Sequence, residues 1–264
     1  MQRGLLTGVL VLVVAGLAFA GDELDIYNPD EVGVSNPAPL TLWEWPSPDV
    51  VLYDNGPLVT HPAGGAGGAD ASALQTTLGM NTLGAGHQNN LGYSLADEFT
   101  VTDAAGWQID TITFFAYQTG STTTSTITGV YVAIWDAAPN AGGTVIWGDQ
   151  TTNRLLTTGW SNIYRVTDTT LTTTNRPIME NVATIGTTLA QGTYWLQWSA
   201  AGSLSSGPWA PPISVLGQTT TGNALQYTTA WAALTDTGTL TPQGMPFIIN
   251  GSVVPVELQS FSIE

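Results

Sequence analysis

Tryptophan is the residue type in this chain that points most directly to a chemical role. The sequence contains 10 Trp, and each indole offers a flat apolar face on which a sugar ring can stack, with an N–H that donates a hydrogen bond. Five of them form the aromatic platform that we expect to bind a ligand: Trp147, Trp160, Trp195, Trp209 and Trp231. The competing interpretation is that Trp fills core volume in a large β-protein without disulfides, and we favour it for any single Trp.

Trp209 is the member of this platform that we would test first. It lies in the segment Ser206-Gly-Pro-Trp-Ala-Pro-Pro212. Proline fixes its own φ angle, so this segment is predicted to be a rigid, exposed turn.

Carboxylates are the second group with a chemical use. Calcium binds about six to eight hard oxygen ligands, and the chain has 20 Asp and Glu. The carboxylates expected to hold a structural calcium are Asp97, Glu98, Asp110 and Asp136, with Asp149 as a further source. The sequence has no Asp-x-Asp-x-Asp loop, so the alternative stays open that an acidic protein scatters its carboxylates for solubility. His61 and His87 are the histidines, and they lack the ligand spacing of a zinc site.

Motifs for catalysis are weak in this sequence. There is no Gly-x-Ser-x-Gly nucleophile motif, and a Ser triad would need one of only 2 His as its base. Two opposed carboxylates would suffice for a glycosidase, and one sequence does not show whether such a pair exists. These observations favour a non-catalytic protein and leave an extracellular hydrolase as an alternative.

Charge and composition exclude several classes of protein. Lys and Arg total 4 against 20 acidic residues, which gives a net charge of −16. This chain cannot neutralise a phosphate backbone, so nucleic-acid binding is excluded. The sequence has no Cys, which excludes disulfides, thiolate metal clusters and thiol chemistry. A hydrophobic content of 43% is high enough for a folded domain.

Residues 1–20 have the layout of a secretory signal peptide. Arg3 precedes an apolar run over residues 5–19, and Ala18-Phe-Ala20 places small residues before a cleavage point at Gly21. The alternative is an uncleaved membrane anchor, but the apolar run is short for one. No second apolar run is long enough to span a bilayer, so the mature chain is not expected to be integral to a membrane. We expect a secreted or cell-surface protein, and the absence of Cys suggests a bacterial one.

The rest of the chain is predicted to be all-β. Residues 21–48 form an acidic, Pro-rich lead, residues 49–252 a β-sandwich domain, and residues 253–264 a C-terminal strand or sorting tail. Short alternating segments separated by turn signals are typical of a sandwich or barrel, and we predict a single antiparallel, jelly-roll-like β-sandwich. One short helix is expected over residues 71–78. The predicted strands cover residues 49–53, 97–102, 107–117, 126–135, 145–147, 163–166, 184–188, 193–199, 227–233, 246–251 and 254–263.

Alternation within two of these strands assigns side chains to faces. In residues 126–135, one face is expected to carry Ile127, Val130, Val132 and Ile134, and the other Tyr131, Ala133 and Trp135. In residues 193–199, Trp195 and Gln197 share the face opposite Leu196 and Trp198.

The C-terminal segment has a second potential role. Its apolar residues Val256, Leu258, Phe261 and Ile263 follow Pro255, which could separate them from the domain. Such a strand can pair with a neighbouring copy and build a fibre. The alternative, which we favour, is that it forms the last strand of its own domain.

Several segments resemble a group of uncharacterised exported bacterial β-sandwich proteins. They are Ala96-Asp-Glu-Phe-Thr-Val, Gly106-Trp-Gln-Ile-Asp-Thr-Ile-Thr-Phe, Val130-Tyr-Val-Ala-Ile-Trp-Asp, Gly142-Gly-Thr-Val-Ile-Trp-Gly and Gly192-Thr-Tyr-Trp-Leu. The ending Pro255-Val-Glu-Leu-Gln-Ser-Phe is similar to the C-terminal sorting or anchoring tails of such proteins. The resemblance implies a secreted or surface β-sandwich and transfers no catalytic residue.

Three functions are therefore expected, in order of preference. The first is a non-catalytic module for adhesion that binds a glycan or cell-surface polymer, with structural calcium as the candidate cofactor and no cofactor as the alternative. The second is a structural subunit of an extracellular fibre that self-associates by strand addition. The third is an extracellular hydrolase.

Overall fold

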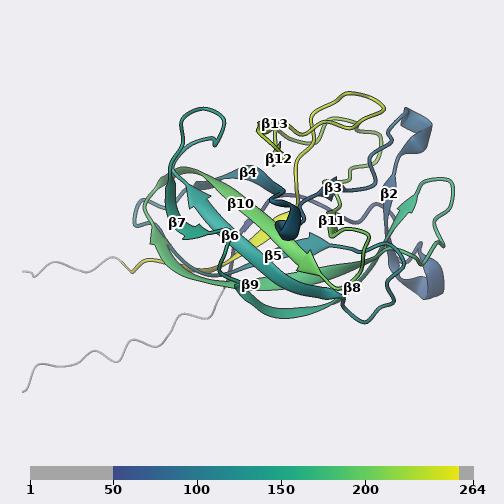
Figure 1. Cartoon of the computed structure of the whole chain (residues 1–264), viewed down its shortest axis with the longest axis horizontal. Coiled ribbons are helices and arrows are strands. Elements are labelled where there is room, and N and C mark those ends of the chain that lie inside the picture. Colours follow the sequence, from purple (N-terminus) through teal and green to yellow (C-terminus); the bar gives the residue numbers. More distant parts are fainter. Residues whose placement is uncertain (1–49, 256–264) are drawn as a thin grey trace, which may run out of the picture. The chain divides into compact units, whose positions relative to one another are not determined.

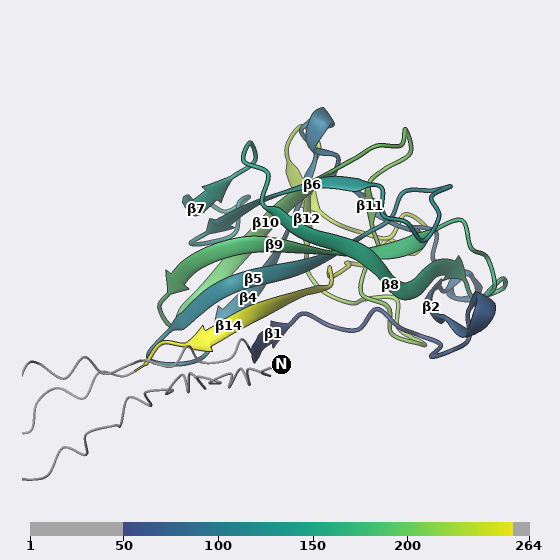
Figure 2. The same ribbon diagram turned by 90° about the horizontal axis from the view of Figure 1, so that it is seen from below.

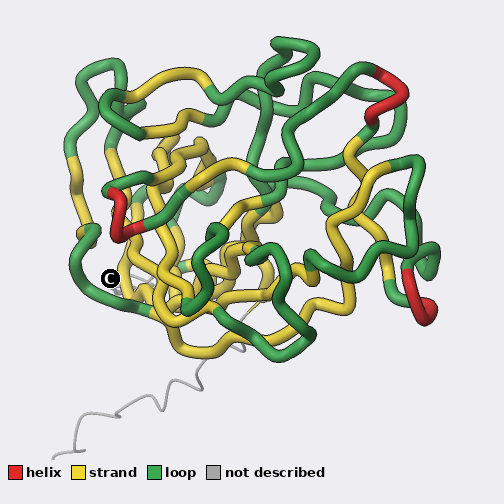
Figure 3. Tube along the Cα trace, turned by 45° about the vertical axis from the view of Figure 1, so that its right-hand side comes forward, coloured by secondary structure: helices red, strands yellow, loops and turns green. Residues whose placement is uncertain are grey.

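The computed structural model describes residues 50–255. The predicted signal peptide, the acidic lead and the apolar residues Val256, Leu258, Phe261 and Ile263 lie outside this range. The described residues are all-β, as predicted, and contain no α-helix. None of their helical turns is long and apolar enough to cross a membrane. Those turns, red in Figure 3, are the 3₁₀ segments η1 (Ala66–Gly68), η2 (Thr76–Leu78) and η3 (Asn89–Leu91).

One six-stranded sheet is mixed and curled into a half-barrel, with its strands side by side in Figure 2. Its pairs β5·β9 and β8·β9 contain register shifts, and such bulges bend a sheet. In spatial order its strands are β1 (Val50–Asp54), β14 (Phe247–Val253), β5 (Trp107–Ala116), β9 (Pro177–Leu189), β8 (Leu155–Thr167) and β2 (Asp70–Leu74).

The second six-stranded sheet is antiparallel in every pair and carries the site described below (Figure 1). A separate two-stranded ribbon joins β3 (Ala85–Gly86) to β11 (Trp209–Ala210). In spatial order the strands of the second sheet are β13 (Trp231–Ala233), β12 (Leu225–Tyr227), β4 (Ser94–Val101), β10 (Gly192–Gly202), β6 (Ile127–Trp135) and β7 (Val145–Asp149).

Two predictions from the sequence are wrong at strand β2. It runs parallel to β8, so the expectation of a wholly antiparallel architecture is wrong at this pair. It also occupies residues 71–74, the first half of the segment expected to be a helix over residues 71–78, whose end forms the 3₁₀ turn η2. Ala71, Ser72 and Ala73 are all buried, and the guanidinium of the buried Arg165 donates to the Ser72 hydroxyl at 3.0 Å. Burial of these small residues against β8 overrides their helix propensity.

The 227–233 segment is a hairpin rather than one strand. β12 and β13 pair antiparallel with Tyr227 opposite Trp231. Residues 228–230 lack the Asn-Gly or Asp-Gly pair that marks a tight turn in a sequence, so the prediction of a continuous strand was wrong.

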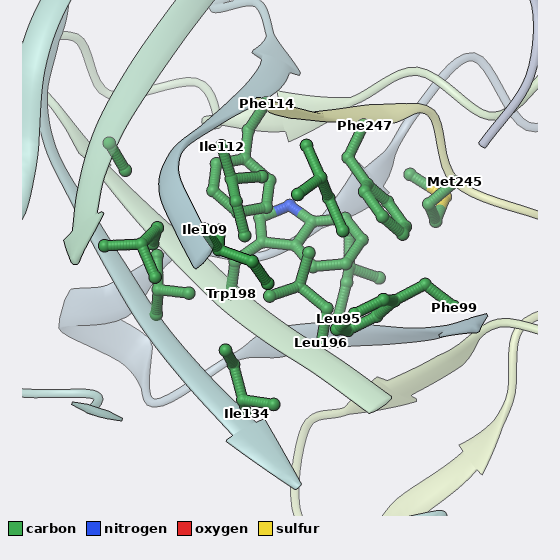
Figure 4. Packing of buried hydrophobic residues seen from close by; sticks show 14 of the residues in the cluster. Leu95, Phe99, Ile109, Ile112, Phe114, Ile134, Leu196, Trp198, Met245 and Phe247 are labelled. Carbon is green, nitrogen blue, oxygen red and sulfur yellow. The ribbon is translucent and has the colours of Figure 1, made fainter. Parts of the chain in front are cut away.

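Side chains from both six-stranded sheets meet in the main hydrophobic core. Figure 4 shows the Trp198 indole among its members. Trp198 stacks on Phe114 with ring centroids 5.2 Å apart, and Phe247 lies 6.0 Å from Trp198 and 6.4 Å from Phe99. This cluster fixes how the strands of the two sheets face each other.

The alternation predicted for β6 and β10 is confirmed except at Ile127, which lies beyond a register shift and packs in a different cluster from Val130, Val132 and Ile134. Ile134, Leu196 and Trp198 are core residues. The neighbouring Trp135 is half-buried, and it packs with Trp195 in a separate cluster. β6 and β10 therefore present a second, outward set of side chains.

Removing the aromatic ring at the centre of this core will destabilise the fold. Phe247 is fully buried, so Phe247→Ala is expected to lower the free energy of unfolding by about 3–5 kcal/mol through lost burial and a cavity. Urea denaturation measures the loss. Leu156→Ala, at a side chain that is 60% exposed, is the control and should change stability by no more than about 0.5 kcal/mol. Equal losses in the two variants would contradict this account of the core.

Candidate functional site

A pocket of about 560 Å³ lies on the outward side of the β13-β12-β4-β10-β6-β7 sheet. Its volume falls in the range of about 300–1,000 Å³ that is typical of small-molecule sites. Aromatic rings from three strands and from Tyr93, which directly precedes β4, line the pocket, together with side-chain amides from β10, from η3 and from the loop after β7. The residues that matter most for the argument are Asn89, Trp135, Gln150, Gln197, Tyr227 and Trp231.

The aromatic wall is assembled from three strands. Trp231 lies between two other rings: its centroid is 6.4 Å from Trp135, in an edge-on arrangement, and 5.3 Å from Tyr227. The hairpin places Tyr227 opposite Trp231, and the pairing of β6 with β10 places Trp135 opposite Trp195. Trp195 is 8% exposed and packs against this group. The wall therefore has a buried aromatic support behind its half-exposed rings.

Gln197 holds the Trp135 ring in place. The Gln197 side chain is 8% exposed. Its Oε1 accepts a hydrogen bond from Trp135 Nε1 at 2.9 Å, and its Nε2 donates to Ser94 Oγ at 2.9 Å. Both ends of the amide are used, so Trp135 cannot rotate without breaking a partly buried hydrogen bond.

A second polar group lies two residues further along β10. Ser199 Oγ donates to Gln150 Oε1 at 2.7 Å and accepts from Asn89 Nδ2 at 3.0 Å. Gln150 Nε2 is buried and has no hydrogen-bond partner within residues 50–255. An unpaired buried donor costs about 1–3 kcal/mol, so a ligand that accepts this hydrogen bond would be favoured.

The pocket lining contains no carboxylate and no basic side chain. Two carboxylates flank lining residues in the chain: Asp136 directly follows Trp135, and Asp149 directly precedes Gln150. Hydrogen bonds donated by Thr151 and Thr152 hold the pKa of the Asp149 carboxyl well below its usual range. The lining is thus suited to an uncharged ligand with a flat apolar face and several hydroxyl groups.

The structure separates the five Trp of the predicted platform. Trp231 lines the pocket and Trp195 supports it from below. Trp147 lies under the Arg154 guanidinium, 4.2 Å from its ring centroid, and Trp160 packs on Tyr164 at 5.2 Å. Trp209 is half-buried on β11 rather than in an exposed turn, and it borders other hollows.

Sequence reasoning missed several residues of this pocket: Asn89, Tyr93, Trp135, Gln150, Gln197 and Tyr227. The outward position of Trp135 and Gln197 was available from alternation. Their meeting with Trp231 depends on strand pairings that are distant in sequence, which no local pattern reveals.

The residues expected to hold calcium are not brought together. Asp97 and Glu98 are neighbours on β4, Asp110 lies on β5 of the other sheet, and Asp136 follows β6. Within residues 50–255, no group of three or more His, Cys, Asp or Glu could hold a metal ion. Asp136 instead accepts from the backbone N–H and the hydroxyl of Thr144, each at 2.7 Å.

Asp97 is a buried carboxyl, 2% exposed. It accepts hydrogen bonds from the backbone N–H of Met245 at 2.8 Å, from Asn55 Nδ2 at 3.0 Å and from the N–H of Glu98 at 2.9 Å. Burial outweighs these bonds and raises the pKa of Asp97 to about 7. The hollow beside it measures only about 120 Å³, which is small for a substrate.

His87 is a second buried side chain whose pKa is shifted by burial. Its ring is 1% exposed, and its Nδ1 has no hydrogen-bond partner within the described residues. Burial lowers the pKa of His87 from its usual 6.5 to about 4. Both groups are therefore disposed to stay uncharged near pH 5.5.

These two groups predict opposite pH dependences of stability. The folded pKa of Asp97 is raised, so its contribution is complete below about pH 4 and is lost as the pH rises to about 7. The folded pKa of His87 is lowered, so its contribution is complete above about pH 6.5 and is lost as the pH falls to about 4. In the wild type the two slopes oppose each other between these limits.

Variants separate the two effects in urea denaturation measured across this pH range. His87→Leu should become less stable as the pH rises, and Asp97→Asn should become more stable, each by on the order of 3 kcal/mol because one pKa unit corresponds to about 1.4 kcal/mol. Parallel pH profiles for the two variants would contradict the assignment.

Comparison with known proteins adds no function to this site. No protein-family model, curated protein or solved structure matches the chain. The inference of function therefore starts from the geometry of the pocket.

Proposed function

We propose that this protein is a secreted or cell-surface, non-catalytic module that binds a glycan or surface polymer in the pocket between Trp135 and Trp231. The observation that carries the proposal is the convergence of Trp135, Tyr227 and Trp231 with the amides of Gln150 and Gln197. We also propose that the protein is exported by a bacterium, and the layout of residues 1–20 supports this. We further propose that the two six-stranded sheets form a jelly-roll-like sandwich, and the core that they share supports this.

A sugar suits this pocket for a physical reason. A pyranose ring has one apolar face of C–H groups and a rim of hydroxyls, and aromatic walls with a few placed polar groups match both. Gln150 Nε2 offers a donor that the protein does not use. A fixed wall also reduces the ordering cost of binding.

Catalysis receives less support from the same geometry. Hydrolysis of a glycoside needs two opposed carboxyl groups, and the pocket lining has none. Asp97, the carboxyl group whose raised pKa is suited to acid catalysis, lies at a different and much smaller hollow.

Removal of the central ring of the wall tests the proposal. Trp231→Ala should weaken binding to its sugar by about tenfold or more, because loss of about 1.4 kcal/mol of stacking and burial corresponds to that factor. The measurement is a glycan array followed by calorimetric titration with the best-bound neutral sugar.

Trp160→Ala is the matched control, since Trp160 is also half-buried but lies on β8 away from the pocket. It should retain the affinity of the wild type. The absence of any sugar bound by the wild type, or an equal loss in the two variants, would contradict the proposal.

A second candidate function is assembly by strand addition. β1 is at an edge of its sheet and pairs only with β14 among the described strands. Its Val50 and Val51 side chains are 49% and 60% exposed, and an exposed apolar edge is a template for a further strand.

Deletion of residues 254–264 tests this second function. If the C-terminal segment of one copy pairs with the edge of another, the truncated chain should lose higher oligomers in light-scattering measurements at high concentration. The same mass distribution with and without the segment would rule it out as the assembly strand.

A further inference from the structure

A second hollow lies on the same sheet, next to the pocket between Trp135 and Trp231. It has a volume of about 430 Å³. Trp209, Pro208 and Leu204 supply apolar lining, and Gln88, Asn90 and Ser205 supply polar groups. Like that of the first pocket, its lining contains no carboxylate and no basic side chain.

Gln88 is the feature of this hollow that points to a ligand. Its side chain is 5% exposed. Its Oε1 has no hydrogen-bond partner within residues 50–255. A buried carbonyl left unpaired costs about 1–3 kcal/mol, and unsatisfied groups of this kind are uncommon in folded proteins. Gln88 Oε1 lies over Gly86 beside the Trp209 ring, and a hydroxyl that enters the hollow and reaches this oxygen would supply the missing hydrogen bond.

The two hollows follow each other along β10. Gln197 and Ser199 line the first, and Ala201 and Gly202 line the second. The four steps along the strand from Gln197 to Ala201 span about 13 Å at the usual rise of a strand. That distance is longer than one sugar ring and suits a short chain of them.

The turn η3 separates the hollows and is fixed to β10. Asn89 donates to Ser199 Oγ, and the backbone N–H of Ala200 donates to the His87 carbonyl at 2.9 Å. Asn89 lines the first hollow, whereas Asn90 and Leu91 line the second. Leu91 is 57% exposed, so a ligand that spans both hollows would cross an apolar residue on η3.

We propose that the two hollows are subsites for one linear, uncharged polysaccharide, with the Trp231 pocket holding one part of the chain and the Trp209 hollow holding another. This inference rests on the proposed function and names its ligand class. The absence of charge in both linings, in a chain of net charge −16, opposes acidic polymers such as polyuronides or sulfated glycans.

Chain length is the variable that tests this inference. Cello-, malto-, xylo-, manno- and chito-oligosaccharides of increasing length are titrated against the full chain, with oligogalacturonides as the acidic comparison. For at least one neutral series, affinity should rise by about tenfold or more between the disaccharide and the longest member. The oligogalacturonides should not bind.

Substitutions in the second hollow separate a binding role from a structural one. Gln88→Met removes the unpaired amide with little change in volume, so thermal stability should stay the same or rise. Affinity for the longest bound oligosaccharide should fall by about tenfold in Gln88→Met and in Trp209→Ala. Affinity for the disaccharide, held in the Trp231 pocket, should not change in either variant.

The outcomes distinguish failure of the second subsite from failure of the proposed function. Affinity that stops rising at the disaccharide, together with unchanged long-chain binding in Gln88→Met and Trp209→Ala, would overturn the second subsite and leave the Trp231 pocket standing. Preferential binding of oligogalacturonides would overturn the uncharged ligand class. Failure of every series to bind would overturn the proposed function and this inference together.

Discussion

The pocket depends on the buried amide of Gln197. One end of that amide accepts from the Trp135 indole on β6, and the other donates to Ser94 on β4. Because strand side chains alternate, the same β10 that buries Leu196 and Trp198 in the core must present Gln197 on the opposite face. The packing of the core thus positions the polar base of the site, and the aromatic wall is held before any ligand arrives.

Much of the fold could be predicted from local patterns, because strands leave a period of two in the sequence. The faces of β6 and β10 followed from that period. The parallel β2 was not predicted, because Ala71 and Ala73 are small residues that do not favour strands, and the burial of residues 71–74 does not alternate. The β12–β13 hairpin was missed because its turn lacks the usual residues.

The site was less predictable than the fold for a related reason. Trp231 reaches the pocket only because β12 pairs with β4, and Trp135 only because β6 pairs with β10 in a particular register. Such pairings join residues that are far apart in the chain. The abundance of Trp therefore identified the type of residue that lines the pocket. It did not identify which Trp residues do so, because Trp147 and Trp160 were predicted to line it and lie elsewhere in the fold.

The roles of the carboxylates were also hard to predict from the sequence. Asp136 and Asp149 accept hydrogen bonds from threonine hydroxyls and backbone N–H groups close by in sequence, which is how Asp stabilises turns. The many Asp–Thr pairs of this acidic chain are used in this way, and the two hollows on β10 stay free of charge. An acidic protein can in this manner present a neutral surface to an uncharged ligand.

The most direct measurement of the central claim is an NMR titration that follows the indole N–H signals of the full chain. A neutral oligosaccharide that binds in the pocket should shift the signals of Trp135 and Trp231, whose rings line it, and leave those of Trp160 and the core residue Trp198 in place. A bound sugar that leaves Trp135 and Trp231 unmoved, or shifts only the signals of Trp residues elsewhere, would contradict the account.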